Sequence, residues 1–205
     1  MIQIENLILN RQKDIILTIE NLKLDKGRKI LLVGDNDSGK SILIKTLHGS
    51  YHHFKGNILF NDRARLFPRK KEHSLLVDNT CQVLNDENVW KNLTLPWSEI
   101  SATRKQKMLD LCKIAGLQEN LSIKLGLLSF SAQKMVELIR AAVQLPLLLL
   151  LDDFDNYFDA KKEEIALEIC NYAVNSGSTV LATSKRLLTG FDQTFRIQNN
   201  RVVSL

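Results

Sequence analysis

The segment from Gly34 to Ser41 has the residue types and the spacing of a phosphate-binding loop. It matches the pattern G-x-x-x-x-G-K-S as Gly34, Asp35, Asn36, Asp37, Ser38, Gly39, Lys40 and Ser41, and Ile42 follows it. In such a loop, backbone N–H groups and the N-terminus of the next helix face a polyphosphate. The lysine reaches the β- and γ-phosphates, and the serine hydroxyl ligates Mg²⁺. We therefore predict that residues 34–42 bind a nucleotide, with Lys40 and Ser41 nearest to the chemistry.

Two residues of this loop are expected to weaken the site. Asp37 brings a carboxylate close to the expected phosphate oxygens, which is unfavourable unless Mg²⁺ or Lys40 screens the like charges. Ile42 follows Ser41, so no second hydroxyl is offered to the phosphates.

A pair of carboxylates follows a leucine-rich strand later in the chain. Residues 147–151 are all leucine, and Asp152 and Asp153 come directly after them. A buried strand delivers such residues to the C-terminal edge of a sheet, where ligands of open α/β folds bind. Asp152 is expected to hold Mg²⁺ through water, and Asp153 to orient or deprotonate an attacking water. The alternative is a strand that ends in a polar turn or a helix cap.

The elements that must position these residues indicate an α/β fold. Apolar strands are expected at 2–9, 15–19, 29–33, 56–61, 74–78, 147–152 and 178–183, with a hairpin at 195–203 around Asn199 and Asn200. Helices are expected at 41–47, 102–115, 131–144 and 161–175, the third capped by Ser129 or Ser131. The helical stretch between 79 and 145 indicates a subdomain inserted into the sheet domain.

Composition restricts the functions that remain. The chain has 205 residues, a net charge of +5 and three widely spaced cysteines without a CxxC pair, which favours a reducing, cytoplasmic location. We expect neither a signal peptide nor a membrane span, because the longest apolar run covers only residues 145–151. The basic clusters at 69–71 and 104–107 are interpreted as solvated surface, and nucleic-acid binding is not expected, because no aromatic residues interleave with them.

Together these segments resemble the ATP-binding cassette (ABC) family, specifically the nucleotide-binding subunits of ABC transporters. The resemblance covers nearly the whole chain, and the compact length and the stretch 86–96 are most similar to the lipoprotein-release and cell-division branch. It implies one P-loop NTPase cassette over residues 1–205. Its mixed-sheet core, with N-terminal antiparallel strands, would comprise 1–78 and 146–205, and its helical signature subdomain would comprise 79–145.

The resemblance also assigns residues outside the phosphate loop. The family's signature LSGGQ corresponds to the stretch that begins at Leu128, so Ser129 would contact the nucleotide of a partner chain. By the same correspondence, Asp153 takes the place of the catalytic glutamate and Ser184 that of the switch histidine. Asn79 stands at the glutamine-loop position near the metal, and Arg11 stands where an aromatic residue stacks on adenine.

Several of these positions depart from the family pattern. Phe130 and Ser131 replace two glycines of the signature, which let the backbone approach the γ-phosphate. Asp153 is one methylene shorter than glutamate, and Ser184 lacks the imidazole. A displacement of about 1 Å can cost about a hundredfold in rate, so slow hydrolysis, or none, is expected. Because the changes fall on both halves of the composite site, neither a homodimer nor a heterodimer would have an intact site.

The resemblance implies a subunit that binds ATP and Mg²⁺ at the interface of a homodimer or heterodimer and drives or gates an integral-membrane permease. It would be peripheral on the inner face of the cell membrane. Trp90, Leu93, Leu95 and Trp97 lie where relatives of this branch contact the permease; ordinary core packing is the alternative for them. A second hypothesis is a catalytically inactive, ATP-dependent dimerisation switch. A soluble ABC protein acting on DNA or ribosomes is disfavoured, because such relatives carry coiled coils or tandem cassettes.

Overall fold

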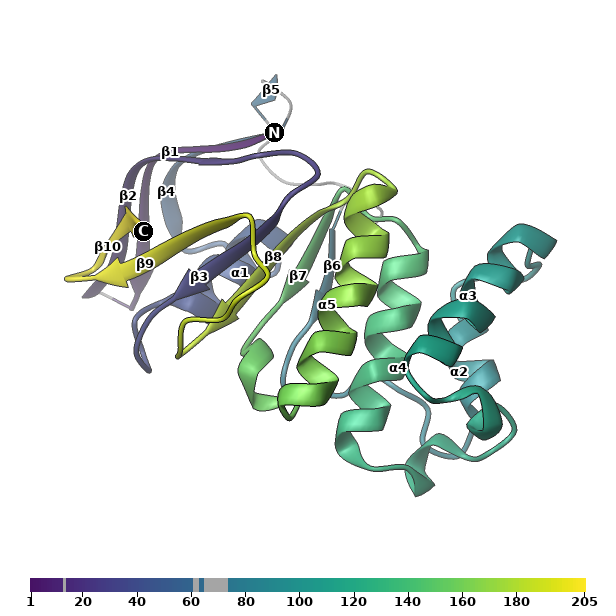
Figure 1. Ribbon diagram of the computed structural model, residues 1–205. Helices are drawn as coiled ribbons and strands as arrows, with labels where there is room; N and C mark the ends of the chain where they lie inside the picture. Colours follow the sequence, from purple (N-terminus) through teal and green to yellow (C-terminus); the bar gives the residue numbers. More distant parts are fainter. Residues whose placement is uncertain (13, 61–62, 65–73) are drawn as a thin grey trace.

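The computed structural model describes residues 1–12, 14–60, 63–64 and 74–205. These residues form one mixed ten-stranded sheet in the order β5-β4-β1-β2-β10-β9-β3-β8-β7-β6 (Figure 1). The strands are β1 (Ile2–Arg11), β2 (Asp14–Leu24), β3 (Lys29–Val33), β4 (Phe54–Phe60), β5 (Arg63–Ala64), β6 (Ser74–Val77), β7 (Leu148–Leu151), β8 (Thr179–Ser184), β9 (Gln193–Gln198) and β10 (Arg201–Ser204). The helices are α1 (Lys40–His48), α2 (Val89–Thr94), α3 (Ala102–Ile114), α4 (Phe130–Val143) and α5 (Ala160–Asn175), with 3-10 turns η2 (Gln118–Asn120), η3 (Leu125–Leu127) and η4 (Phe154–Asn156). This architecture confirms the predicted α/β class.

The strands β3, β8, β7 and β6 are parallel and form the part of the sheet that positions the site. Their side chains alternate between two buried clusters, as the period of two in a strand requires. Leu31 and Leu149 face the cluster that includes α4 and α5, whereas Ile30 and Leu148 face the cluster that includes α1. Both faces are covered, which explains why these strands are continuously apolar.

The antiparallel half of the sheet carries a long hairpin from β1 to β2, whose last pair in register is Arg11 with Asp14. In β1 the buried positions shift after Asn6, which has a left-handed φ of 49°. Gly56 of β4 lies against this irregularity with φ +105°, and an added Cβ there would lie 2.3 Å from the Asn6 carbonyl oxygen. Arg11, at the end of β1, lies beside the phosphate loop.

The predicted helices are present, and their caps settle one open choice. Ser129, not Ser131, caps α4 by accepting a hydrogen bond of 3.4 Å from the Ala132 N–H, and Asp159 caps α5 by accepting one of 2.9 Å from the Lys162 N–H. The six-residue helix α2, capped by Asn88, was not predicted. Its apolar positions are too few for a helical period to be recognised in the sequence.

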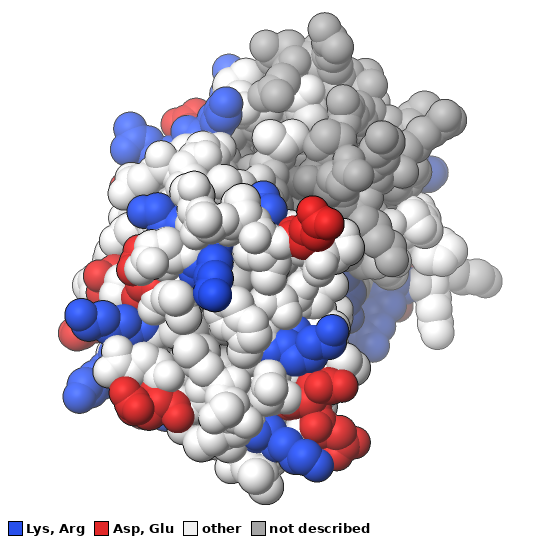
Figure 2. Space-filling view, turned by 90° about the vertical axis from the view of Figure 1, so that its right-hand side faces the viewer, with Lys and Arg blue, Asp and Glu red and all other residues white. Residues whose placement is uncertain are grey.

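The basic clusters have different outcomes. Residues 69–71 lie outside the described residues. In the second cluster, the Arg104 guanidinium stacks 4.8 Å from the Trp97 ring, and the Lys105 ammonium lies 6.0 Å from the Trp90 ring, so aromatic side chains do accompany these two cations. The face toward α3 shows Lys and Arg interspersed with Asp and Glu (Figure 2). Within the described part of the chain, no helix combines the length and the apolar character needed to cross a membrane.

Candidate functional site: the phosphate loop and the edge of the parallel sheet

The phosphate loop connects β3 to α1, and two glycines allow its tight path. Gly39 has φ +98°, and a Cβ on it would lie 3.0 Å from Cγ2 of Ile16. A Cβ on Gly34 would lie 2.7 Å from Oγ of Ser38, inside the loop. The N–H of Gly34 donates to the carbonyl oxygen of Ser184 at 3.2 Å, which anchors the loop to the neighbouring strand β8. The nine-residue helix α1 then points its N-terminus at the loop.

Lys40 lies at the centre of this loop. Its side chain is buried, and Nζ donates hydrogen bonds to the carbonyl oxygens of Gly34 at 2.6 Å and Asp35 at 2.7 Å. Burial lowers the pKa of Lys40, while the nearby carboxylates of Asp153 and Asp152 oppose that shift. The ammonium is therefore fixed between the loop and the acidic pair.

The acidic pair follows β7 directly and is held by β8. The Thr183 hydroxyl donates to Oδ1 of Asp152 at 2.7 Å and accepts from the Asp153 N–H at 2.8 Å. Tyr157 donates from its hydroxyl to the Asp152 carbonyl oxygen at 2.5 Å. Asp153 has a left-handed φ of 53°. Its pKa is raised, mainly by burial and secondarily by Asp152, with Lys40 acting in the opposite direction.

An open cavity of about 520 Å³ joins these parts. It is lined by the loop and helix residues 36–42 together with Arg11, Ile16, Lys45, Tyr51 and Asp153. The structure thus brings together Arg11, Lys40, Ser41 and Asp153, which the sequence places far apart. Arg11 reaches the cavity from the hairpin tip, and Tyr51 is held beside it by a hydrogen bond from its hydroxyl to the Asn10 carbonyl oxygen.

Asp37 lines the cavity, but its carboxylate is directed toward solvent. Its side chain is 90% exposed, and Oδ1 lies 3.9 Å from Nη1 of Arg11 at the mouth of the cavity. The left-handed φ of 58° at Asp37 accompanies this outward position. In the free protein this carboxylate thus forms a solvent-exposed ion pair, which contributes little stability. Its repulsion from bound phosphates stays a prediction.

Ser184 does not lie in the cavity lining, contrary to the position expected for a catalytic residue. The residue is fully buried, and its hydroxyl donates to the Arg186 carbonyl oxygen at 2.7 Å and accepts from the Arg186 N–H at 3.1 Å. Both interactions close a turn within its own segment. Ser184 therefore supports the phosphate loop through its carbonyl oxygen, and its side chain does not line the cavity.

Asn79 and Ser129 lie outside the cavity lining formed by the described residues, but in different places. The N–H of Asp152 donates to the Val77 carbonyl oxygen at 2.9 Å, so Asn79, two residues after Val77, follows the same sheet edge as the acidic pair. Asn79 is exposed there. Ser129 is exposed at the N-terminus of α4, away from the cavity lining.

Three residues of the site were missed from the sequence. Thr183 was noted only as part of a strand end, although a hydroxyl next to Ser184 on the strand neighbouring β7 was a usable signal. Tyr51 and Tyr157 carried no local signal, because each contributes through a hydroxyl bond to a backbone carbonyl that only the folded chain brings near.

Comparison with known proteins identifies the family. The sequence profile described as ABC transporter matches residues 17–156, which include the phosphate loop, the signature stretch and the acidic pair. The chain belongs to the ABC transporter family. A relative in Bacillus subtilis (strain 168), an uncharacterized ABC transporter ATP-binding protein named YybJ, is 26% identical over 188 residues, covering 90% of this chain and 85% of YybJ.

Solved structures agree with this ABC assignment at the level of the fold. An ATP-binding subunit of an ABC transporter superposes with a TM-score of 0.85 at 19% identity, covering 100% of this chain and 90% of that one. CbiO1 from Clostridium perfringens, part of the ABC transporter complex CbiONQ, gives 0.83 at 19% identity, covering 98% of this chain and 86% of CbiO1. The predicted P-loop ABC cassette is confirmed. The lipoprotein-release branch stays a prediction.

The residues present fit ATP and Mg²⁺, the ligands expected of an ABC cassette. Ser38 lines the cavity, and its buried hydroxyl lacks a hydrogen-bond partner among the described residues, which suits a phosphate oxygen. Ser41, Asp152 and Asn79 offer a hydroxyl, a carboxylate and an amide oxygen at one edge of the sheet. Hard oxygen donors of this kind are those that Mg²⁺ prefers.

Proposed function

We propose that the chain is the ATP-binding subunit of an ABC-type membrane complex, and that it binds Mg-ATP at a dimer interface and hydrolyses it slowly or not at all. The observation that carries this proposal is the cavity in which Lys40, Ser41 and Asp153 meet. Within the same proposal, residues 1–78 and 146–205 act as the core and residues 79–145 as the helical subdomain.

The chain's residues divide the work of binding. Backbone N–H groups of residues 36–42 and the N-terminus of α1 surround the phosphates, and Lys40 exchanges its loop carbonyls for β- and γ-phosphate oxygens. Ser41, Asp152 and Asn79 hold Mg²⁺, which neutralises charge on the phosphates when it is bound. Arg11, with its planar guanidinium at the cavity mouth, packs against the adenine base.

Two features support slow hydrolysis. Asp153 is the carboxylate placed to accept a proton from water, but its side chain is one methylene shorter than the family's glutamate. The raised pKa of Asp153 favours its action as a base. In this proposal, the short side chain of Asp153 is what limits the rate of hydrolysis. Ser184 is turned into its own segment and offers nothing to the γ-phosphate.

The surface around the signature supports a second ATP-binding chain as a partner. Leu127 is 77% exposed and Phe130 is 50% exposed beside Ser129. Large apolar side chains gathered at an exposed helix start favour burial by another protein. Each chain would then place its Ser129 near the nucleotide of the other, in a homodimer or a heterodimer.

The region around α2 supports an integral-membrane partner in part. Leu93 is fully buried, so core packing accounts for it. Leu95 is 40% exposed, and the half-buried Trp90 and Trp97 rings lie under the Lys105 and Arg104 cations. Leu95 thus remains available to a permease-like subunit, which would hold the chain at the inner face of the cell membrane, whereas Trp90 and Trp97 pack partly against the core.

The test is nucleotide binding with Mg²⁺ by titration calorimetry, for the wild type, Lys40→Ala and the exposed control Lys26→Ala. We expect binding by the wild type and the control, and loss of binding in Lys40→Ala. Equal, negligible binding by all three would contradict the proposal.

Phosphate release measured on the same samples, alone and with the partner, tests the catalytic part. Turnover near the enzyme median of about 10 s⁻¹ would refute slow hydrolysis. ATP-dependent dimerisation without phosphate release would favour the alternative function, an inactive dimerisation switch.

A further inference from the structure

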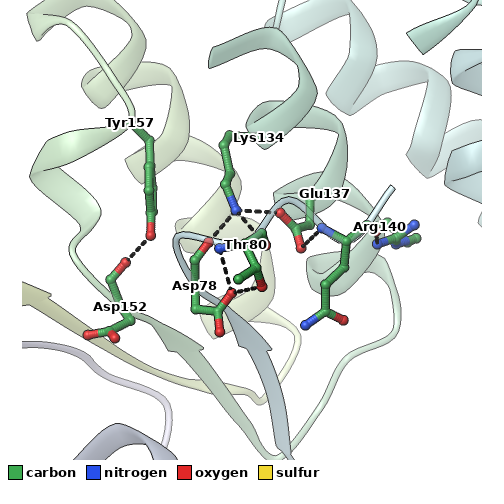
Figure 3. Close-up of polar contacts among 8 residues, drawn as sticks. Asp78, Thr80, Lys134, Glu137, Arg140, Asp152 and Tyr157 are labelled. Atoms are coloured by element: carbon green, nitrogen blue, oxygen red, sulfur yellow. Dashed lines mark hydrogen bonds and ion pairs between the residues drawn. The ribbon is translucent and has the colours of Figure 1, made fainter. Parts of the chain in front are cut away.

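Three charged side chains on one face of helix α4 form hydrogen bonds with the segment that follows β6. Lys134, Glu137 and Arg140 are spaced three residues apart, so they lie on one face of the helix. They contact backbone groups of Asp78, Thr80 and Gln82 (Figure 3). The contacted residues are every second residue of the segment. The contacts are to backbone groups, so they fix the path of the segment from Asp78 to Gln82.

Lys134 is the centre of this arrangement and is fully buried. Its ammonium donates to the Asp78 carbonyl oxygen, to the Thr80 carbonyl oxygen at 3.2 Å and to Oε2 of Glu137 at 2.8 Å. It also lies 4.8 Å from the centre of the Tyr157 ring. A buried ammonium is costly unless it is paired and hydrogen-bonded, so all of these contacts must persist together.

Glu137 and Arg140 contact one further residue of the segment, Gln82. Oε1 of Glu137 accepts from the Gln82 N–H at 3.1 Å, and Arg140 donates to the Gln82 carbonyl oxygen. Replacing a buried ion pair by apolar residues is often neutral or stabilising. The Lys134–Glu137 pair is therefore poorly explained by stability alone, and the backbone geometry that it imposes is the better explanation.

Asn79 lies between the two residues that Lys134 contacts. Both carbonyl groups that flank it, those of Asp78 and Thr80, accept from Lys134. The Asp78 carboxylate also closes a turn across it, since Oδ1 accepts from the Thr80 N–H at 2.9 Å and from the Thr80 hydroxyl at 2.5 Å. Asn79 itself stays exposed at the sheet edge.

The same ammonium reaches the other side of the predicted metal site. Tyr157, whose ring lies against Lys134, donates to the Asp152 carbonyl oxygen (Figure 3). Lys134 thus contacts both the segment that carries Asn79 and the residue that supports Asp152.

We propose that Lys134, held by Glu137, is a positioning residue for Mg²⁺ binding: it sets the place of Asn79 relative to Asp152. The inference rests on the proposed function, because it takes Asn79 and Asp152 as the residues that hold the metal. Residues that orient metal ligands typically change metal affinity or activity by about 10–100-fold when they are replaced.

The experiment measures ATP affinity with EDTA and with Mg²⁺, using a fluorescent ATP analogue, and reports the ratio of the two. The test variant is Lys134→Met combined with Glu137→Gln, which removes the ammonium but keeps an acceptor for the Gln82 N–H. We expect affinity in EDTA to stay within about twofold and the gain from Mg²⁺ to fall about tenfold. Arg140→Gln is the matched control, because it removes the contacts to the Gln82 and Asn92 carbonyl oxygens but leaves those of Lys134 with Asp78 and Thr80, so the gain from Mg²⁺ should stay unchanged.

A double-mutant cycle with Asn79→Ala separates positioning from general destabilisation. If Lys134 acts through Asn79, the combined substitutions lose no more of the Mg²⁺ gain than Asn79→Ala alone. Additive losses, or an unchanged gain in the Lys134 variant, would overturn the inference. A wild type that shows no gain from Mg²⁺ would instead overturn the proposed function. If the double substitution prevents folding, Glu137→Gln alone is measured; a smaller loss of the gain supports the inference and no loss overturns it.

Discussion

The hydroxyl of Thr183 donates a hydrogen bond of 2.7 Å to Oδ1 of Asp152. The Thr183 hydroxyl oxygen also accepts a hydrogen bond of 2.8 Å from the backbone N–H of Asp153. One fully buried side chain of β8 therefore orients both members of the acidic pair, although it adds no charge to the site. The arrangement links the strand next to the phosphate loop with the strand that carries the carboxylates.

Replacing Thr183 by valine should remove the hydrogen bonds from β8 to the acidic pair while keeping the shape of the side chain. The buried Asp152 carboxylate and the Asp153 N–H each lose a partner, so we expect the free energy of unfolding to fall by about 1–3 kcal/mol. We also expect weaker Mg-ATP binding, measured by calorimetry.

Thr179→Val is the control for this prediction. Thr179 is buried at the other end of β8, and its hydroxyl accepts from the Gly27 N–H at 3.1 Å and donates to the Asp25 carbonyl oxygen at 3.4 Å. Its loss should lower stability without changing Mg-ATP binding. Equal effects of the two variants on Mg-ATP affinity would contradict the role given to Thr183.

Asp153 should make the free protein less stable as the pH rises. Its pKa in the folded state is raised above the ordinary 3.8, mainly by burial. The folded state thus binds its proton more tightly than the unfolded state, so the destabilisation is absent below the ordinary pKa and complete above the raised one. Asp153→Asn should therefore be more stable than the wild type at pH 7, with a difference that shrinks as the pH falls through this window.

Urea denaturation between pH 4 and 7 measures this difference. The exposed Asp86→Asn variant removes the same charge and serves as the reference for general electrostatic effects. A difference between wild type and Asp153→Asn that does not vary with pH would refute the prediction.

The sequence was sufficient for the parts of the site that depend on local rules. A phosphate loop needs its glycines, lysine and serine at fixed spacing, and a strand that ends in carboxylates places them at the sheet edge. The orientations of Asp37 and Ser184 could not be predicted. They depend on which partner lies nearby: Arg11 from a distant hairpin tip for Asp37, and the backbone of Arg186 for Ser184.

The contacts of α4 were equally inaccessible from the sequence. Lys134 and Glu137 read as an ordinary pair three residues apart on a helix, which is usually solvent-exposed. Only the packed chain reveals that both are buried against backbone groups of residues 78–82. A hydrogen bond to a backbone group does not depend on the side chain of the contacted residue. Such contacts therefore leave no recognisable sequence pattern in residues 78–82.

Ser184→Ala should distinguish a structural residue from a nucleotide contact. The hydroxyl closes a turn with Arg186, so we expect a loss of about 0.5–1.5 kcal/mol in the free energy of unfolding and unchanged Mg-ATP affinity. Thermal unfolding and calorimetry on the same sample measure both quantities. A clear loss of ATP affinity with unchanged stability would restore the role that the family resemblance implies for this position.

The cysteines should differ in their reaction with iodoacetamide at pH 8. Burial raises the pKa of the Cys112 and Cys170 thiols to about 12, and both side chains are fully buried. Cys81 is only partly buried, although burial followed by Glu137 raises its pKa. Mass spectrometry should find slow labelling of Cys81 in the native protein, and labelling of the other two only in urea. Labelling of native Cys112 would contradict the packing of α3.

Asp153→Glu is the variant that separates a slow ATPase from an inactive switch. If the missing methylene limits the reaction, restoring it moves the carboxylate about 1 Å toward the water and raises phosphate release by as much as about a hundredfold. Mg-ATP affinity should stay within about twofold, because Lys40 and the loop are untouched. Asp153→Asn is the control and should release no phosphate. If Asp153→Glu is also inactive while ATP still drives dimerisation, the reach of this carboxylate is not the limiting defect, and the altered signature at Phe130 and Ser131 becomes the reason that the chain acts as a switch.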